Sequence, residues 1–197
     1  MSPFPIYVLD EDLLRSNMKS YAQSLKKYYP SKTRAYYATK AMMNLALCKI
    51  AEQEGLGLDV SSGGELYTAI KAQFPMDQVL MHGNNKTEGE LRLALQNNVG
   101  RIVIDNLDEA HLISRLTDEL KVQVDVLLRV KPGVHADSHH YMVTGTEDSK
   151  FGCNILNGEA WEAIRQIIQL KGLHLRGIHC HIGSQILSLD GFNKSVV

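Results

Sequence analysis

One lysine of this sequence stands where a short aromatic segment changes into a helical one. Residues 35–44 read Ala-Tyr-Tyr-Ala-Thr-Lys-Ala-Met-Met-Asn, and Lys40 is their single lysine. An amine at the end of a strand can point into the mouth of a sheet or barrel, where burial lowers its pKa and leaves part of it neutral and nucleophilic. A neutral lysine can form a Schiff base with an aldehyde cofactor. The segment alone also fits a surface lysine at a strand end.

Two histidines, His179 and His181, flank Cys180 in a second polar segment. Strand alternation places the two imidazoles on one face and Cys180 on the other, where we expect a buried thiol that only packs. Such a pair could bind zinc, but no third ligand is identifiable, so no metal is predicted. The alternative is an imidazole stacked on an aromatic cofactor, with the amide of Gly183 and the hydroxyl of Ser184 near a phosphate.

The elements that carry these residues repeat regularly. Apolar segments that predict strands recur every 22 or 23 residues and begin near Ala35, Gly57, Val79, Arg101 and Val124. Helix signals follow them, including the capping pairs Ser62 with Glu65, Thr87 with Glu90, and Asn106 with Glu109. Alternating strands and helices predict βα units around a parallel sheet. A nucleotide-binding sheet would usually carry Gly-x-Gly-x-x-Gly after its first strand, and its absence favours a (β/α)8 TIM barrel.

The predicted barrel is incomplete. A helix at 159–169 and a sixth strand at 173–182 follow the five regular units, and a further short strand is expected at 5–9 before the first helix. Eight units typically need about 250 residues. The 197 residues therefore predict about six βα units of a barrel that does not close.

Polar residues close each predicted strand. Because active sites of such barrels lie at the carboxyl ends of the strands, we expect these residues to form one site. They are Lys40, Asp59, His82, Asp105, Arg129 and His181.

Composition limits the classes of partner and compartment. A net charge of −1 and the lack of any Lys/Arg run argue against nucleic acid or an anionic membrane, so a small molecule is expected. No apolar run reaches the length of a membrane span, and the first residues lack an export signal. Three widely spaced cysteines fit a reducing compartment, and we expect a cytoplasmic protein.

Six segments together resemble the diaminopimelate decarboxylase family of barrel-type pyridoxal-phosphate enzymes, the fold type III or alanine racemase-like class. They are Tyr37-Ala-Thr-Lys-Ala41, Gly57-Leu-Asp-Val-Ser-Ser-Gly-Gly-Glu-Leu66, His82-Gly-Asn-Asn-Lys86, Arg129-Val-Lys-Pro-Gly133, Ser149-Lys-Phe-Gly152 and His179-Cys-His-Ile-Gly-Ser-Gln185. The resemblance implies a Schiff base of pyridoxal phosphate at Lys40, a pyridine ring covered by His181, and Gly183 and Ser184 at the phosphate. Asp59 and Arg129 would line the pocket.

The resemblance also implies an activity and a domain plan. The chain would be the N-terminal portion of an enzyme that decarboxylates meso-2,6-diaminopimelate to L-lysine, the last step of lysine biosynthesis. Residues 1–10 would hold a strand that pairs with a C-terminal β domain absent from this chain, and residues 11–197 would be the partial barrel. A homodimer with shared active sites is implied, and this span alone is expected to be inactive. A related ornithine, arginine or carboxynorspermidine decarboxylase, or a non-catalytic pyridoxal-phosphate barrel, is the alternative.

Overall fold

The computed structural model describes residues 6–29, 31–133, 151–183, 186 and 189–195. Its described strands form one parallel sheet in which each strand pairs with the next along the chain, except that β5 pairs with both β6 and β7. They are β1 (Tyr36–Ala38), β2 (Gly57–Val60), β3 (Val79–Met81), β4 (Arg101–Ile104), β5 (Val124–Lys131), β6 (Cys153–Asn154) and β7 (Leu173–His179). The predicted parallel sheet is confirmed, whereas the two-residue β6 was not expected.

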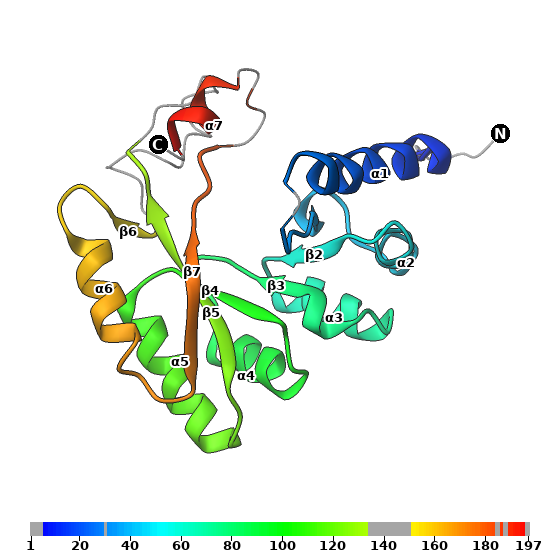
Figure 1. Cartoon of the computed structure of the whole chain (residues 1–197). Helices are drawn as coiled ribbons and strands as arrows, with labels where there is room; N and C mark the ends of the chain where they lie inside the picture. The colour runs from blue at the N-terminus through cyan, green and yellow to red at the C-terminus, as the bar shows by residue number, and fades with distance from the viewer. Residues whose placement is uncertain (1–5, 30, 134–150, 184–185, 187–188, 196–197) are drawn as a thin grey trace.

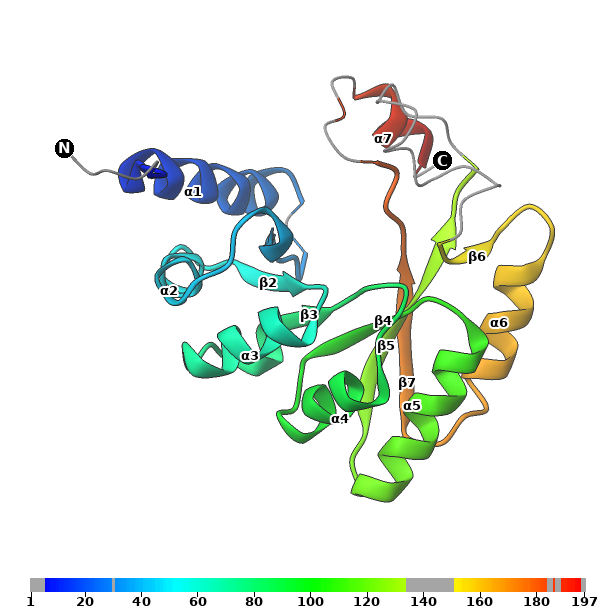
Figure 2. The same ribbon diagram turned by 180° about the vertical axis from the view of Figure 1, so that it is seen from behind.

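Helices connect the strands and follow one face of the curved sheet (Figures 1 and 2). They are α2 (Leu45–Gln53), α3 (Gly63–Lys71), α4 (Glu88–Gln96), α5 (Leu107–Leu120) and α6 (Glu159–Ile167), with α1 (Glu11–Tyr28) at the start and α7 (Asp190–Ser195) at the end. Short 3-10 turns η1 (Thr39–Ala41) and η2 (Met76–Gln78) adjoin β1 and β3. Among the described residues, no helix is long and apolar enough to cross a bilayer.

The side chains of the sheet separate into two sets. The helix-covered face carries fully buried residues that belong to the main hydrophobic core, such as Leu58, Met81, Ile102, Val126 and Leu128. Opposed residues of a parallel sheet share a face, and the register opposes Ala38, Asp59, Leu80 and Arg101 in one row and Arg129 and His179 in another. The second face therefore carries the polar residues and corresponds to the interior of a barrel.

First-turn glutamates join the helices to the loops before them. Thr87 and Glu90 form the predicted capping box of α4. Ser62 and Asn106 cap α3 and α5 as predicted, but the carboxylates of Glu65 and Glu109 accept the backbone N–H of Ser61 and Asp105 instead of that of the cap residue. The glutamates therefore tie each strand end to the helix that follows it.

The N-terminal segment departs from the prediction. Residues 6–10 have no regular secondary structure, and the side chains of Ile6, Tyr7, Val8 and Leu9 are exposed. A strand needs a neighbour for its backbone hydrogen bonds, and no strand lies beside these residues in the described part of the chain. Pro5, where the strand was expected to begin, is outside the described residues, and the pairing with a β domain stays a prediction.

Candidate functional site

Polar side chains in or directly after six strands lie at the carboxyl end of the helix-free face. Lys40 lies in η1 directly after β1, so the lysine follows the strand and does not close it as predicted. Asp59 lies in β2 and Arg129 in β5, while His82 and Asp105 directly follow β3 and β4. The predicted sixth strand, β7, ends at His179, so His181 lies two residues beyond it.

Two histidines and a carboxylate form the centre of this group. Nδ1 of His82 lies 3.2 Å from Oδ1 of Asp59, and the rings of His82 and His179 are 5.4 Å apart and tilted by 41°. The His82 and Asp59 atoms are not aligned for a hydrogen bond, and neither they nor Nδ1 of His179 have a hydrogen-bond partner among the described residues. Buried polar atoms normally have a partner, and these three lack one within the described residues.

Arg129 and Asp105 form a buried ion pair next to them. Arg129 is 4% exposed and Asp105 is 5% exposed, and Nη1 of Arg129 lies 3.3 Å from Oδ1 of Asp105. The guanidinium also lies over the ring of Phe151, 4.5 Å from its centroid. Burial lowers the pKa of Arg129, and the carboxylate of Asp105 opposes that shift. An arginine with so high an ordinary pKa nevertheless stays charged, so it places one fixed positive charge in the site.

Both histidines of the second polar segment are poor bases. Burial, then the charges of Lys40 and Arg129, lower the pKa of His181 to about 4. Burial, then His82 and Arg129, lower the pKa of His179 to about 4 as well. Both imidazoles are therefore neutral near pH 7 and add no charge to a site that already contains the guanidinium of Arg129. The charge of Lys40 contributes to the lowered pKa of His181.

The exposure of two side chains in this region differs from the prediction. Lys40 is exposed, not buried as expected, because η1 lies on the open rim of the sheet. Cys180 is exposed too, since it follows β7, whose described strand neighbour is β5 alone. Gly183 has a φ of 148°, a conformation that favours glycine, and Ser184 lies outside the described residues.

Two functional contacts were missed from the sequence. Oε2 of Glu65 accepts hydrogen bonds from Oγ1 of Thr39 at 2.6 Å and from the backbone N–H of Ser61 at 2.7 Å. Glu65 thereby ties the turn that carries Lys40 to the end of β2. The capping signal at Ser62 identified this glutamate but not Thr39, which lies in η1 after β1.

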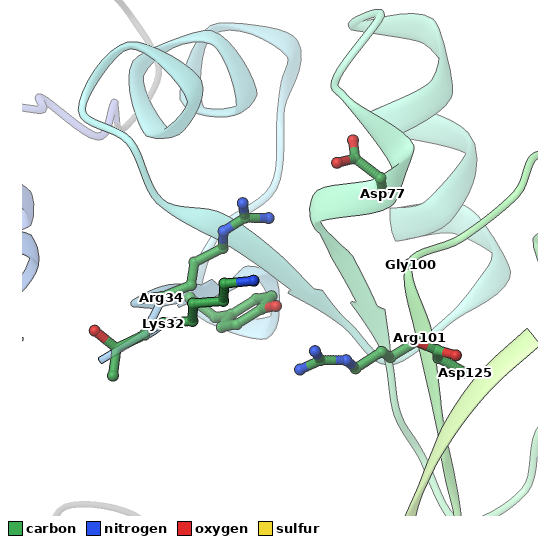
Figure 3. Close-up of a pocket in the computed structure, with 8 residues that line it drawn as sticks. Lys32, Arg34, Asp77, Gly100, Arg101 and Asp125 are labelled. Atoms are coloured by element: carbon green, nitrogen blue, oxygen red, sulfur yellow. The ribbon is translucent and has the colours of Figure 1, made fainter. Parts of the chain in front are cut away.

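A separate hollow of about 660 Å³ lies at the opposite, amino ends of the strands. Figure 3 shows Lys32 and Arg101 extending towards one another there. Its charges are mixed, and none of the predicted site residues lines it: the lining residues are Lys32, Thr33, Arg34, Tyr36, Asp77, Gly100, Arg101 and Asp125. This hollow is therefore distinct from the candidate site.

The donor set at the carboxyl ends suits an aldehyde cofactor better than a metal. Within the described ranges, no three His, Cys, Asp or Glu side chains are placed to share a metal ion. An exposed amine, Lys40, can react with an aldehyde, and the neutral His181 can lie against an aromatic ring. The guanidinium of Arg129, the carboxylate oxygen of Asp59 and the two imidazole nitrogens suit a polar group that both donates and accepts hydrogen bonds.

The fold and the site together define a class of protein. It is a barrel protein that can hold an aldehyde cofactor on an amine, because its parallel βα sheet carries a lysine on the rim beside neutral histidines and a buried arginine. Comparison with known families narrows this class. Residues 12–197 match the family described as pyridoxal-dependent decarboxylase, pyridoxal binding domain. The chain belongs to this family, and its cofactor is pyridoxal phosphate, as predicted.

Individual relatives agree with that assignment. The chain is 48% identical over 95% of its length to diaminopimelate decarboxylase of Bacillus subtilis, of which it covers 43%, and 46% identical over 95% to that of Staphylococcus aureus, of which it covers 44%. Crystal structures of diaminopimelate decarboxylase complexed with L-lysine, from Helicobacter pylori and M. jannaschii, match with TM-scores of 0.88 and 0.85 at 26% and 31% identity. These matches cover 98% and 96% of this chain but 48% and 44% of those structures.

The chain thus spans less than half the length of the relatives that it matches. The predicted barrel class is confirmed, and the described strands are the first part of that barrel.

Proposed function

We propose that the protein containing this chain catalyses the pyridoxal-phosphate-dependent decarboxylation of meso-2,6-diaminopimelate to L-lysine and carbon dioxide. The observation that carries the proposal is 48% identity across 95% of the chain to a diaminopimelate decarboxylase. The reaction replaces one carboxylate of the substrate by a proton on the same carbon. In lysine biosynthesis this is the last step, and we place it in the cytoplasm.

Each site residue is proposed to have a defined task. Lys40 holds the aldehyde carbon of the cofactor, and His181 lies against the pyridine ring. The backbone N–H of Gly183 and the hydroxyl of Ser184 donate hydrogen bonds to the phosphate oxygens, which accept them. Asp59 and Arg129 line the pocket and orient the polar edge of the ring. When bound, pyridoxal phosphate supplies an electron sink for the bond that breaks.

Neutral imidazoles matter for this arrangement. A protonated His181 would add a positive charge close to the guanidinium of Arg129, and like charges at short range disfavour one another. With its pKa lowered to about 4, His181 keeps its ring neutral beside the charged guanidinium of Arg129. Orientation is the main task left to the protein, because the breaking bond must stand perpendicular to the conjugated ring.

The substrate and the assembly are further parts of the proposal. We propose a small amino-acid substrate, no nucleic-acid or membrane partner, and a homodimer whose subunits share active sites. The rim of the described sheet supports a shared site, because Lys40 is exposed on it and can be covered by another polypeptide segment.

The test is an assay of the full-length protein with and without added pyridoxal phosphate. Lysine formation from meso-diaminopimelate is expected to exceed turnover of ornithine, arginine and carboxynorspermidine. Lys40→Ala should remove the visible absorbance of the bound cofactor, while Lys49→Ala, a change of an exposed lysine on α2, should keep it. Preferred turnover of another amine, or cofactor reduced by borohydride onto a different lysine, would contradict the proposal.

A further inference from the structure

Lys86 is a buried lysine on the connection between β3 and α4. Its side chain is 2% exposed. The ammonium group lies 2.5 Å from the carbonyl oxygen of Gly83, 2.8 Å from that of Val103, and 2.7 Å from Oε1 of Glu109. An ammonium group has three donors, so each of them has an acceptor. These acceptors come from the β3–α4 connection, β4 and α5.

Removing a charged pair from water is expensive, and a well-packed apolar pair of similar volume is often as stable. Stability alone therefore does not explain why this site carries the Lys86–Glu109 ion pair. The second carboxylate oxygen of Glu109 suggests a further role, because Oε2 accepts a hydrogen bond from the backbone N–H of Asp105 at 2.7 Å. Burial raises the pKa of Glu109, and the charge of Lys86 opposes that shift. Lys86 thus favours the ionised carboxylate, which is the stronger acceptor for Asp105.

Asp105 connects this pair to the cofactor site. Its backbone is held by Glu109, and its carboxylate faces Arg129 at 3.3 Å. The charge of Arg129 in turn lowers the pKa of both His179 and His181. A continuous set of buried contacts therefore runs from Lys86 through Glu109 and Asp105 to Arg129, that is, from the β3–α4 connection through α5 and the β4–α5 connection to β5.

We propose that Lys86 is a positioning residue: by its ion pair with Glu109 it holds the β4–α5 connection so that Asp105 faces Arg129, and so sets Arg129 in the cofactor site. The inference rests on the proposed function, since it assumes that Arg129 faces pyridoxal phosphate. Lys86 itself has no direct contact with the cofactor in this arrangement.

The experiment is a double-mutant cycle on the full-length protein with Lys86→Met, Asp105→Asn and both changes together. The main measurement is the Kd of the apo-protein for pyridoxal phosphate, followed by absorbance; kcat and KM are measured in parallel. If Lys86 acts through Asp105, each single change should raise the Kd about tenfold. The Kd of the double variant should then exceed that of either single variant by no more than about threefold. Independent losses that multiply to about a hundredfold would overturn the proposal.

A control pair and a second variant separate positioning from general stability. Arg15→Met breaks an ion pair of 2.8 Å between α1 and Glu54, away from the site, and should leave the cofactor Kd unchanged. A second variant combines Lys86→Met with Glu109→Leu and removes both charges, so that no charge is left buried and unpaired. This variant replaces Lys86→Met in the cycle if the single variant is insoluble. It should still fold, with a melting temperature lowered by the loss of the acceptor for the N–H of Asp105. Measured well below its unfolding transition, it should bind cofactor about tenfold more weakly. Wild-type affinity in that variant would overturn the proposal.

The wild-type protein distinguishes this failure from a failure of the proposed function. A full-length protein that neither binds pyridoxal phosphate nor forms lysine would contradict the proposed function and the inference with it. An active wild type with multiplying losses would contradict the positioning role alone.

Discussion

Replacing His179 by asparagine should flatten the acid dependence of stability. Burial, with smaller contributions from His82 and Arg129, lowers the pKa of His179 from an ordinary 6.5 to about 4. Above pH 6.5 the imidazole is neutral in both the folded and the unfolded protein, so it contributes no pH dependence. Below that pH the unfolded chain takes up a proton that the folded protein does not, and stability is lost as the pH falls towards 4.

The size of this effect follows from the two pKa values. With 6.5 in the unfolded and about 4 in the folded state, His179 lowers the free energy of unfolding by about 2 kcal/mol between about pH 7.5 and about pH 5. The His179→Asn variant lacks this titration. Its loss of stability over the same range should therefore be smaller than that of the wild type by about 2 kcal/mol.

Urea unfolding of the full-length apo-protein at the two pH values measures the difference. His111→Asn, a change of an exposed histidine on α5, is the matched control and should keep the wild-type dependence. The asparagine variant removes an imidazole without adding a charge, so that any difference in slope reports on protonation. An unchanged slope in His179→Asn would refute the reasoning, because His179 would then titrate alike in both states.

Three further outcomes are expected. His181→Ala should weaken pyridoxal-phosphate binding and slow turnover, with no zinc in either protein by elemental analysis; stoichiometric zinc lost on mutation would instead support a metal site. Gly152→Ala should lower the free energy of unfolding by about 1–3 kcal/mol in a urea titration, because φ at Gly152 is +70° and a Cβ would lie 2.8 Å from the carbonyl oxygen of Arg129. Residues 1–197 expressed alone should form no lysine from meso-diaminopimelate, and turnover within about tenfold of the full-length enzyme, a barrier difference of about 1.4 kcal/mol, would contradict this.

Local sequence determined most of the fold. The spacing of apolar segments predicted the strands because parallel βα units of similar size repeat along the chain, and side-chain caps at Ser62, Thr87 and Asn106 marked the helix starts. These signals involve residues that are close in sequence, so no tertiary information is needed to read them. Local signals predict the ends of strands less well, because a strand ends where its neighbour no longer pairs with it. The last strand, β7, was predicted to end at Ile182 and ends at His179.

The types of the site residues could also be read from the sequence, since Lys40, Asp59, Arg129 and His181 each stand at the end of a predicted strand. Which of them touch depends on how the strands pair, and only the tertiary structure decided that. The register of β5 with β7 brings Arg129 opposite His179. The charge of Lys40, which comes from the first strand unit, contributes to the lowered pKa of His181.

Burial and long-range partners were likewise decided by the tertiary structure. Glu65 and Glu109 read as ordinary helix-capping residues, yet their carboxylates bind Thr39 and Lys86, 26 and 23 positions away along the chain. Lys40 and Cys180 were expected to be buried and are exposed, because burial depends on which elements cover a residue. A sequence determines which side chains can do chemistry, whereas distances, desolvation and charge coupling arise only when strands far apart in the chain are packed together.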